Sequence, residues 1–258
     1  MEGAMTFDEV AALYHRVRPR YPSDLFDIVR GLSGLAAGSR VLEIGSGTGI
    51  ATRPLLERGF DVTAIEPGAA LVDVARTELA GYPNVRWVGT RFEDWPLPAD
   101  PFDMVFSATA FHWIDRRVRV ARAAAALRPG GYLAIASYRH VAGGDTAFFN
   151  EIQKCYLLHM PGARADERLQ APVEIRPATV ELTRKGLFRE PSVHRWVVEE
   201  TYDRTGYFDL LSTYSGHRLL SPDRRDALFA CIGAQIDRLP DKRVRKAYLH
   251  ELIVARKA

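Results

Sequence analysis

The chain has 258 residues, of which 47% are hydrophobic and 26% charged, enough for one large domain or one domain with a sizeable insertion. Its 35 basic and 32 acidic residues leave a net charge of +3, too small to require a nucleic acid or an anionic membrane as partner. Cys155 and Cys231 lie far apart without a CxxC pair, so we expect neither a disulfide nor a cysteine zinc site. Residues 1–7 do not resemble a signal peptide and no segment resembles a membrane span, which predicts a soluble cytoplasmic protein.

Short β-branched segments alternate with helical patterns through the first half of the chain, after an amphipathic helix that begins near Thr6. Strands are predicted at 40–44, 61–65, 85–88, 102–107 and 132–136. Helices are predicted between them at about 48–58, 67–79 and 115–127. Strands that alternate with helices are typical of βαβ units, so they predict a parallel sheet with helices on both faces.

The pattern changes after Ser137. Residues 142–190 favour helix and contain no clear strand, and the sheet is expected to resume with strands at 193–198 and 247–255. Further helices are predicted at about 203–214 and 221–238. We therefore predict three segments: N-terminal helices with a Rossmann-like cofactor-binding core over 1–141, a helical cap insertion over 142–190, and the rest of the sheet with additional cap helices over 191–258.

A glycine-rich turn follows the first predicted strand, in the sequence VLEIGSGTG from Val41 to Gly49. Glycines allow the backbone to turn sharply and to approach a ligand closely. Their spacing is GxGxG, and Ile50 stands where the dinucleotide fingerprint GxGxxG requires its third glycine. The carboxylate of Glu43, just before the turn, favours a cationic ligand over a diphosphate. Glu66 ends the next strand, where an acidic side chain can accept both ribose hydroxyls; the alternative is a solvated residue at a helix start.

Five motifs in this order resemble the class I S-adenosylmethionine-dependent methyltransferases, in particular their small-molecule, type 11-like branch. They are Val41–Gly49, Glu66, Arg91–Pro96, Phe102–Phe106 and Leu127–Leu133, and they cover about residues 38–138. The resemblance implies an α/β fold with a doubly wound, mostly parallel seven-stranded sheet and an antiparallel last strand. It also implies S-adenosyl-L-methionine as the cofactor and S-adenosyl-L-homocysteine as its product.

The cofactor-binding residues that this resemblance implies are Glu43, Gly45, Ser46, Gly47, Gly49, Glu66, Pro67, Phe92, Glu93 and Ser107. Gly45 and Gly47 are expected along the methionine part, Glu66 at the ribose, and Phe92 with Glu93 beside the adenine. Many relatives carry Asp-Ala where this chain has Arg91-Phe92, which leaves Glu93 or the Phe92 backbone to contact the adenine amino group. The alternative for Phe92 is that its side chain only packs within the protein and does not border the adenine.

Tyr14 and Arg18 lie in the segment YHRVRPRYP, residues 14–22. Related enzymes often fold an N-terminal helix over the cofactor, so both residues are candidates for its methionine end, where an arginine fork fits a carboxylate. The alternative is that these arginines are solvated and that the prolines only shape a turn.

No catalytic triad is expected, because methyl transfer from a sulfonium mainly requires alignment of the reacting atoms and exclusion of water. The acceptor is expected at the carboxyl ends of the strands. There, His112 is the candidate base, with a partly buried structural histidine as the alternative. The segment SATAFHW lacks the motif of enzymes that methylate base amines. Candidate substrate-binding residues are Trp113, Tyr138, Tyr202, Tyr214 and His217.

These residues predict an S-adenosylmethionine-dependent methyltransferase acting on oxygen or nitrogen of a small molecule. The Phe-His-Trp segment resembles methyltransferases of trans-aconitate and similar acids, so an acidic or aromatic metabolite is the candidate acceptor. The alternatives are a protein that binds S-adenosylmethionine without methylating and, less favoured by the glycine spacing, a nicotinamide oxidoreductase. The basic segments Arg116–Arg122 and Lys242–Lys246 are predicted to be solvated, so nucleic acid is not an expected partner, and no metal site is expected.

Overall fold

The computed structural model describes residues 10–164, 168–184 and 186–258. The chain divides into two compact units, which are treated separately below. The core unit comprises Arg20–Tyr138, Pro177–Trp196 and His250–Ala258, and the insertion unit comprises Met1–Pro19, Arg139–Arg176 and Val197–Leu249.

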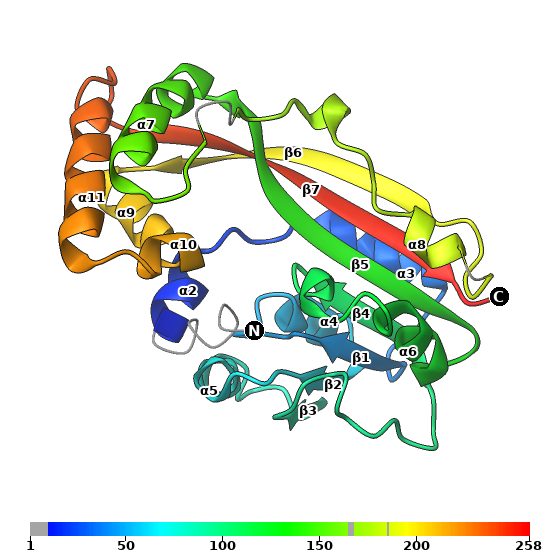
Figure 1. Ribbon diagram of the computed structural model, residues 1–258. Helices are drawn as coiled ribbons and strands as arrows, with labels where there is room; N and C mark the ends of the chain where they lie inside the picture. Colours follow the sequence, from blue (N-terminus) through cyan, green and yellow to red (C-terminus); the bar gives the residue numbers. More distant parts are fainter. Residues whose placement is uncertain (1–9, 165–167, 185) are drawn as a thin grey trace. The chain divides into compact units, whose positions relative to one another are not determined.

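The described strands form one seven-stranded sheet in the order β3-β2-β1-β4-β5-β7-β6 (Figure 1). Their bounds are Arg40–Ile44 for β1, Asp61–Ile65 for β2, Val85–Val88 for β3, Phe102–Ala108 for β4, Leu127–Gly144 for β5, Ser192–Tyr202 for β6 and Val244–Arg256 for β7. Parallel pairing joins β1 to β2 and β4, β2 to β3, and β4 to β5. The strand order reverses between β1 and β4, so the carboxyl ends of these two strands form the switch point at which open sheets bind ligands.

Strand β7 runs antiparallel to β5. The Lys257 amide donates to the carbonyl of Gly131, near the start of β5, at 2.7 Å. The Arg245 carbonyl accepts at 2.9 Å from the amide of Asp145, just after the end of β5. The sheet is therefore mixed, and the predicted fold class, a doubly wound and mostly parallel seven-stranded α/β sheet, is confirmed.

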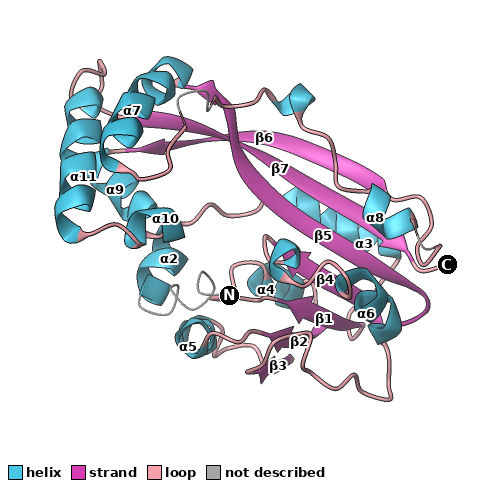
Figure 2. Cartoon of the chain, viewed as in Figure 1, coloured by secondary structure: helices cyan, strands magenta, loops and turns pink. Residues whose placement is uncertain are grey.

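Strand β5 is much longer than the predicted segment 132–136. It continues to Gly144, and Figure 2 shows that β5, β6 and β7 all extend well beyond the lengths of β1 to β4. The expectation that residues 142–190 contain no strand is wrong for residues 142–144, which belong to β5. Val141 packs with Ala247 and Leu249 of β7, so a partner strand distant in sequence stabilises the extension.

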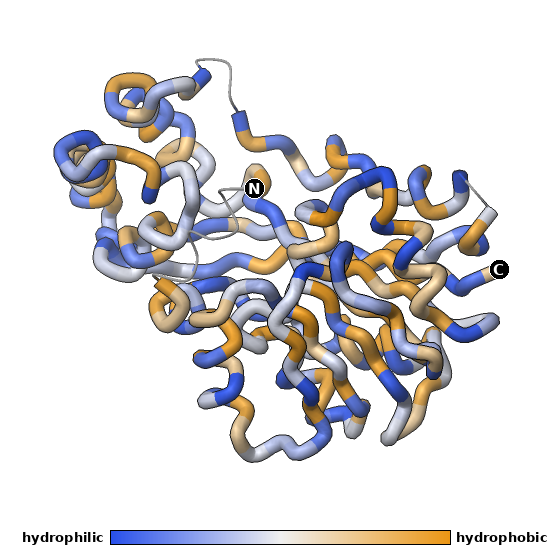
Figure 3. The backbone as a smooth tube through the Cα atoms, turned by 60° about the horizontal axis from the view of Figure 1, so that its bottom comes forward, coloured by the Kyte–Doolittle hydropathy of each residue, from blue (hydrophilic) through white to orange (hydrophobic). Residues whose placement is uncertain are grey.

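The core unit has helices on both faces of its strands, as predicted. Alternate residues of β4 enter different hydrophobic clusters: Phe106 packs with Phe26, and Val105 packs with Ala123. Figure 3 colours the backbone by hydropathy and shows hydrophobic, orange segments interspersed with hydrophilic, blue ones along the chain. The helices of the unit are α3 (Ser23–Ser33), α4 (Thr52–Glu57), α5 (Ala69–Glu78), α6 (Arg119–Ala126), α8 (Val180–Thr183) and the short 3-10 helix η2 (Phe111–Trp113).

The insertion unit has its own hydrophobic core. Phe149 of α7, Leu210 of α9 and Ile232 of α11 belong to one buried cluster with Val244 of β7. The helices of this unit are α2 (Ala11–Val17), α7 (Thr146–His159), α9 (Arg204–Ser212), α10 (Ser215–Arg218), α11 (Pro222–Ile236) and the 3-10 helix η3 (Pro172–Glu174). The cluster therefore joins α7, from the predicted cap segment 142–190, to helices outside it, while residues 177–190 pack within the core unit.

Cys155 of α7 and Cys231 of α11 form a disulfide, with their Cα atoms 5.8 Å apart. The expectation of unlinked cysteines is wrong. The two helices pack against each other and bring the thiols together, a proximity that spacing along the sequence does not reveal.

Reduction of this disulfide should lower the melting temperature of the protein. A disulfide that closes a long loop typically contributes about 2–4 kcal/mol, which for a chain of this size corresponds to several degrees. Calorimetry with and without reductant measures the effect, and the double variant Cys155→Ala/Cys231→Ala is the control. Reductant should leave the melting temperature of the double variant unchanged. If reductant lowered it as much as in the wild type, or did not lower that of the wild type, the disulfide assignment would be contradicted.

Candidate functional site

The glycine loop leaves the carboxyl end of β1 and contains three residues with left-handed backbone angles. Gly45, Gly47 and Gly49 have φ values of 70°, 54° and 81°. Side chains rarely tolerate these angles, so the turn requires glycine. The amides of Gly45 and Ser46 both donate to the Ile65 carbonyl at the end of β2, at 2.8 and 3.2 Å, which fixes the loop against the neighbouring strand.

The three glycines differ in what surrounds them. A Cβ on Gly45 would lie 2.3 Å from the Cβ of Ala110, and one on Gly49 would lie 2.7 Å from Cδ1 of Leu79. A Cβ on Gly47 would meet nothing within 4 Å. Gly45 and Gly49 therefore allow the loop to pack against the protein, whereas the space beside Gly47 is open to a ligand.

Glu66 accepts one hydrogen bond from the glycine loop and one from the segment that follows β2. Oε2 accepts from the amide of Gly47 and Oε1 from the amide of Gly68, each at 2.9 Å. Since a carboxylate oxygen can accept more than one hydrogen bond, the ribose interaction predicted for Glu66 is compatible with these two. Pro67 follows directly and is exposed, before α5 begins.

Glu43 is completely buried beneath the loop, with 0% of its surface exposed. Neither of its carboxyl oxygens has a hydrogen-bond partner among the residues that the structure describes. Burial raises the pKa of Glu43 to about 8; the nearby Thr52 hydroxyl, without reaching hydrogen-bond geometry, opposes the shift, and the Glu66 charge adds to it. At neutral pH the Glu43 carboxyl is therefore mostly protonated.

These features fit the cofactor that the sequence resemblance implies. S-adenosylmethionine carries a cationic methionine part and a ribose with two hydroxyls. A buried carboxyl without a partner offers acceptors to an ammonium, the open side of Gly47 offers room, and the next strand ends in an acidic residue. The residues present thus fit the group.

The predicted adenine loop is held by an arginine of α6. Arg122 donates to the Phe92 carbonyl at 2.8 Å and to the Trp95 carbonyl, and its guanidinium lies 5.4 Å from the centre of the Phe92 ring. The Phe92 side chain is buried. Glu93 accepts at 3.2 Å from the Asp115 amide and at 3.1 Å from Arg91.

Burial alone would raise the pKa of Glu93, but the hydrogen bonds from backbone amides and from Arg91 lower it on balance. An ionised carboxylate that already accepts hydrogen bonds from the protein is thus present where the adenine is expected.

The expectation that the basic segments are solvated is wrong for three residues. Arg119 is buried and pairs with Glu181 at 2.6 Å, Arg122 holds the adenine loop, and Lys246 is buried in the insertion unit. Arg117 does fit the expectation, because its side chain is highly exposed and pairs with Asp115.

The segment after β4 contains a strained residue that the sequence does not reveal. Thr109 has φ 53°, an unusual value for a β-branched side chain. Its amide donates to the Ala136 carbonyl at 2.8 Å, and its hydroxyl lies 2.6 Å from the hydroxyl of Tyr21. Ala110, which follows, is the residue that faces Gly45. The Tyr21 ring lies 5.8 Å from that of Tyr138, so two phenols gather beside this turn.

The other core-unit candidates differ in exposure. Ser107 is fully buried and donates to the Ile44 carbonyl at 2.9 Å, which ties β4 to β1. His112 and Trp113 are exposed on η2, Trp113 by 56%, and their ring centres lie 5.0 Å apart. His112 can therefore exchange protons with solvent, and Trp113 presents an uncovered aromatic face.

The remaining candidates lie in the insertion unit. Arg18 donates to the Thr213 hydroxyl and carbonyl at 2.9 and 3.0 Å, and its guanidinium lies over the rings of Tyr14 and Tyr214. The Tyr202 hydroxyl lies 3.3 Å from that of Tyr248, and the Tyr156 hydroxyl 3.0 Å from Nε2 of His217. These side chains thus form polar contacts within their own unit.

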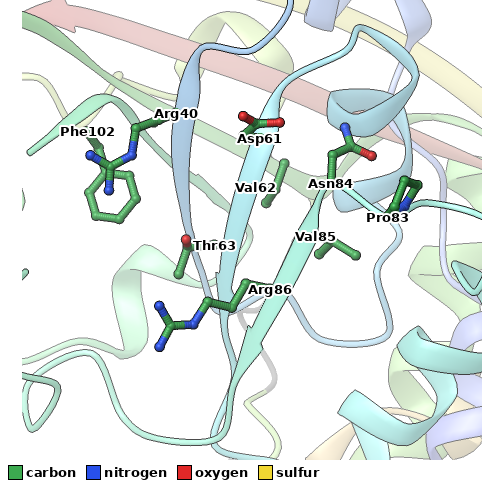
Figure 4. A pocket seen from close by; sticks show the side chains of 9 residues that line it. All are labelled: Arg40, Asp61, Val62, Thr63, Pro83, Asn84, Val85, Arg86 and Phe102. Carbon is green, nitrogen blue, oxygen red and sulfur yellow. The ribbon is translucent and has the colours of Figure 1, made fainter. Parts of the chain in front are cut away.

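A cavity of about 400 Å³ lies near the amino-terminal ends of the core-unit strands, whereas the glycine loop follows the carboxyl end of β1 (Figure 4). Its lining includes Arg40, Asp61, Val85 and Phe102, the first residues of β1, β2, β3 and β4. The glycine loop and Glu66 follow the last residues of β1 and β2. The cavity is therefore not part of the candidate site.

Two classes of feature are not found in the described part of the chain. No described helix has the length and apolar character that crossing a membrane requires. The described side chains also include no group of three or more His, Cys, Asp or Glu residues placed to hold a metal ion.

The raised pKa of Glu43 predicts a pH-dependent stability. The unfolded chain loses this proton near the ordinary value of 4.5, whereas the fold keeps it up to about 8, so Glu43 destabilises the fold increasingly as the pH rises between these values. The melting temperature of Glu43→Gln relative to the wild type should therefore rise by several degrees between pH 5 and pH 8.5. Thermal melts across this range measure it, and a difference independent of pH would contradict the burial of an ionisable carboxyl.

Comparison with known proteins connects this site to a family. Residues 42–135 match a family described as a methyltransferase domain. An uncharacterized methyltransferase of Mycobacterium tuberculosis is 38% identical over 132 residues, 51% of this chain and 51% of that protein. The chain thus spans about half the length of the curated relatives that it matches first.

Solved structures share the fold. A candidate type II methyltransferase from Anaeromyxobacter dehalogenans superposes with a TM-score of 0.62 at 24% identity, over 93% of this chain and 97% of that chain. Phosphoethanolamine N-methyltransferase 2 of Haemonchus contortus, in complex with S-adenosyl-L-methionine, gives 0.53 at 18%, over 97% of this chain and 57% of that chain. The matched segment 42–135 contains Glu43, the glycine loop and Glu66. Through residues 42–135, the chain is therefore similar to methyltransferase domains.

Proposed function

We propose that the protein is an enzyme that binds S-adenosyl-L-methionine at the glycine loop and transfers its methyl group to a small-molecule acceptor. The observation that carries this proposal is the buried Glu43 carboxyl without a partner, beside a GxGxG turn at the switch point of the sheet. A fully buried carboxyl without a hydrogen bond destabilises a fold, and a cationic ligand would compensate for it.

The residues of the core unit would divide the binding task. Glu43 would face the ammonium of the methionine part, and the open side of Gly47 would admit the ligand backbone. Glu66 would accept the ribose hydroxyls while it keeps its hydrogen bonds from Gly47 of the loop and from Gly68. When bound, S-adenosylmethionine supplies a methyl group on a sulfonium, which is already activated for displacement.

The protein would then mainly align an acceptor and exclude water. Polar groups for an acceptor gather after the carboxyl end of β4, where the Thr109 hydroxyl contacts that of Tyr21 and the Tyr21 ring lies near that of Tyr138 on β5. These hydroxyls suit an acceptor oxygen or nitrogen better than carbon. A protonated acceptor would have to lose its proton, and the exposed His112 remains the candidate that would pass it to solvent.

Thermal melts with separate ligands test the cofactor. S-adenosylhomocysteine or S-adenosylmethionine at about 100 times its dissociation constant adds roughly 2.7 kcal/mol, a shift of about 5–10 °C for a chain of this size. NAD should give no shift. Transfer of labelled methyl groups across a panel of acceptors then separates an enzyme from a protein that only binds the cofactor. A shift with NAD alone would contradict the proposal.

Glu66→Ala provides the matched test at the level of one residue. The variant should bind S-adenosylhomocysteine roughly 10- to 100-fold more weakly, because it loses hydrogen bonds to a charged group. Asp73→Ala on α5, which removes an exposed acidic side chain from the following helix, should bind normally. Calorimetric titration measures both affinities, and normal binding by Glu66→Ala would refute the assigned ribose contact.

A further inference from the structure

The insertion unit contains a buried lysine surrounded by aromatic rings. Lys246 of β7 is only 4% exposed. Its Nζ lies 5.4 Å from the ring centre of Tyr214, 5.4 Å from that of Tyr248 and 5.9 Å from that of Phe149 (for the elements, see Figure 1). Such distances allow cation–π attraction, which compensates only part of the lost hydration of an ammonium.

No carboxylate within the described ranges forms an ion pair with Lys246. Its hydrogen bond goes to the Tyr214 hydroxyl at 3.5 Å, the upper limit for such a bond. The neighbouring Arg245, in contrast, pairs with Asp145 and Asp241. The buried ammonium therefore has three donors and one distant neutral acceptor, a combination that costs free energy unless an anion is bound.

A second cation lies close to the same tyrosine ring. The Arg18 guanidinium is 4.5 Å from the ring centre of Tyr214 and donates hydrogen bonds to the hydroxyl and carbonyl of Thr213. Burial would raise the pKa of Tyr214, but the charges of Lys246 and Arg18 lower it on balance, so this position favours negative charge.

The histidines nearby do not add to this positive charge. Burial, with a contribution from the Lys246 charge, lowers the pKa of His217 to about 4 and that of His140 to about 3. Both are neutral at pH 7. Nε2 of His140 is buried and has no hydrogen-bond partner within the described ranges, where a further polar group of this unit is thus unsatisfied.

We infer that the Lys246 cluster, defined as Lys246, Arg18, Tyr214, Tyr248 and Phe149, binds the carboxylate of an aromatic acid. The ammonium and guanidinium supply positive charge, the phenols donate hydrogen bonds, and the ring faces pack against an aromatic body. This binding is argued from residues of the insertion unit alone and does not depend on the proposed function.

Lys246→Met tests the unpaired charge without any ligand. The variant keeps an apolar stem of similar length and removes the buried ammonium, so its melting temperature should rise by a few degrees above that of the wild type. Lys154→Met removes the same charge from an exposed position and should leave the melting temperature nearly unchanged. A clear fall in Lys246→Met would show that the lysine stabilises the fold through its rings, and would overturn the inference.

Ligand binding tests the class of acid. Benzoate, salicylate and 4-hydroxybenzoate are titrated into the full chain beside their neutral amides, with S-adenosylhomocysteine present. At least one acid should bind more than tenfold tighter than its amide. Lys246→Met should lose this preference, whereas Lys246→Arg and Lys154→Met should keep it.

Binding of S-adenosylhomocysteine in the same samples separates the two proposals. If the wild type binds this nucleoside but no acid more tightly than its amide, the inference fails and the proposed function stands. If the acids are preferred but the nucleoside does not bind, the proposed cofactor is wrong while the carboxylate site is supported. Equal preference for acids in Lys246→Met and the wild type would also refute the role of Lys246.

Discussion

The core unit depends on one unfavourable feature, a carboxyl buried without a partner. Folded proteins pair nearly all their buried polar groups, because an unsatisfied one costs free energy. Glu43 violates this rule on β1, directly beneath a turn whose glycines adopt left-handed angles. Strain and unsatisfied groups of this kind gather where proteins bind ligands, and we interpret Glu43 as the group that gives the site its preference for a cationic nucleoside.

The rest of the site holds this carboxyl in place. Glu66 accepts from the Gly47 amide of the turn, the Ile65 carbonyl fixes the start of the loop, and Ala110 packs against Gly45 so closely that no side chain fits there. These contacts come from residues at or just after the carboxyl ends of β1, β2 and β4. Parallel pairing places these three ends side by side. The sheet thus acts as the scaffold, and the loops after its strands carry the chemistry.

Much of this arrangement could be predicted because it depends on local pattern. The strand–glycine–helix sequence around Gly45 and the position of Glu66 follow from residues close together in the chain. The burial of Lys246, the Arg122 contacts with the adenine loop and the Cys155–Cys231 bond depend on elements that meet only after folding. From the sequence, a basic residue in a charged segment is predicted to be solvated. Only the folded structure shows that Lys246 lies among aromatic rings. The extension of β5 to Gly144 cannot be predicted from local sequence either, because it depends on pairing with β7, which is distant in sequence.

The most direct measurement is the number of protons exchanged when S-adenosylhomocysteine binds, obtained by calorimetric titration at pH 7 in buffers of different ionisation enthalpy. Glu43 is mostly protonated in the free protein, and an ammonium beside it would favour its ionised form. The wild type should therefore release about one proton per ligand bound, and Glu43→Gln should release almost none. Binding without proton release in the wild type, or equal release in both proteins, would contradict the role assigned to Glu43.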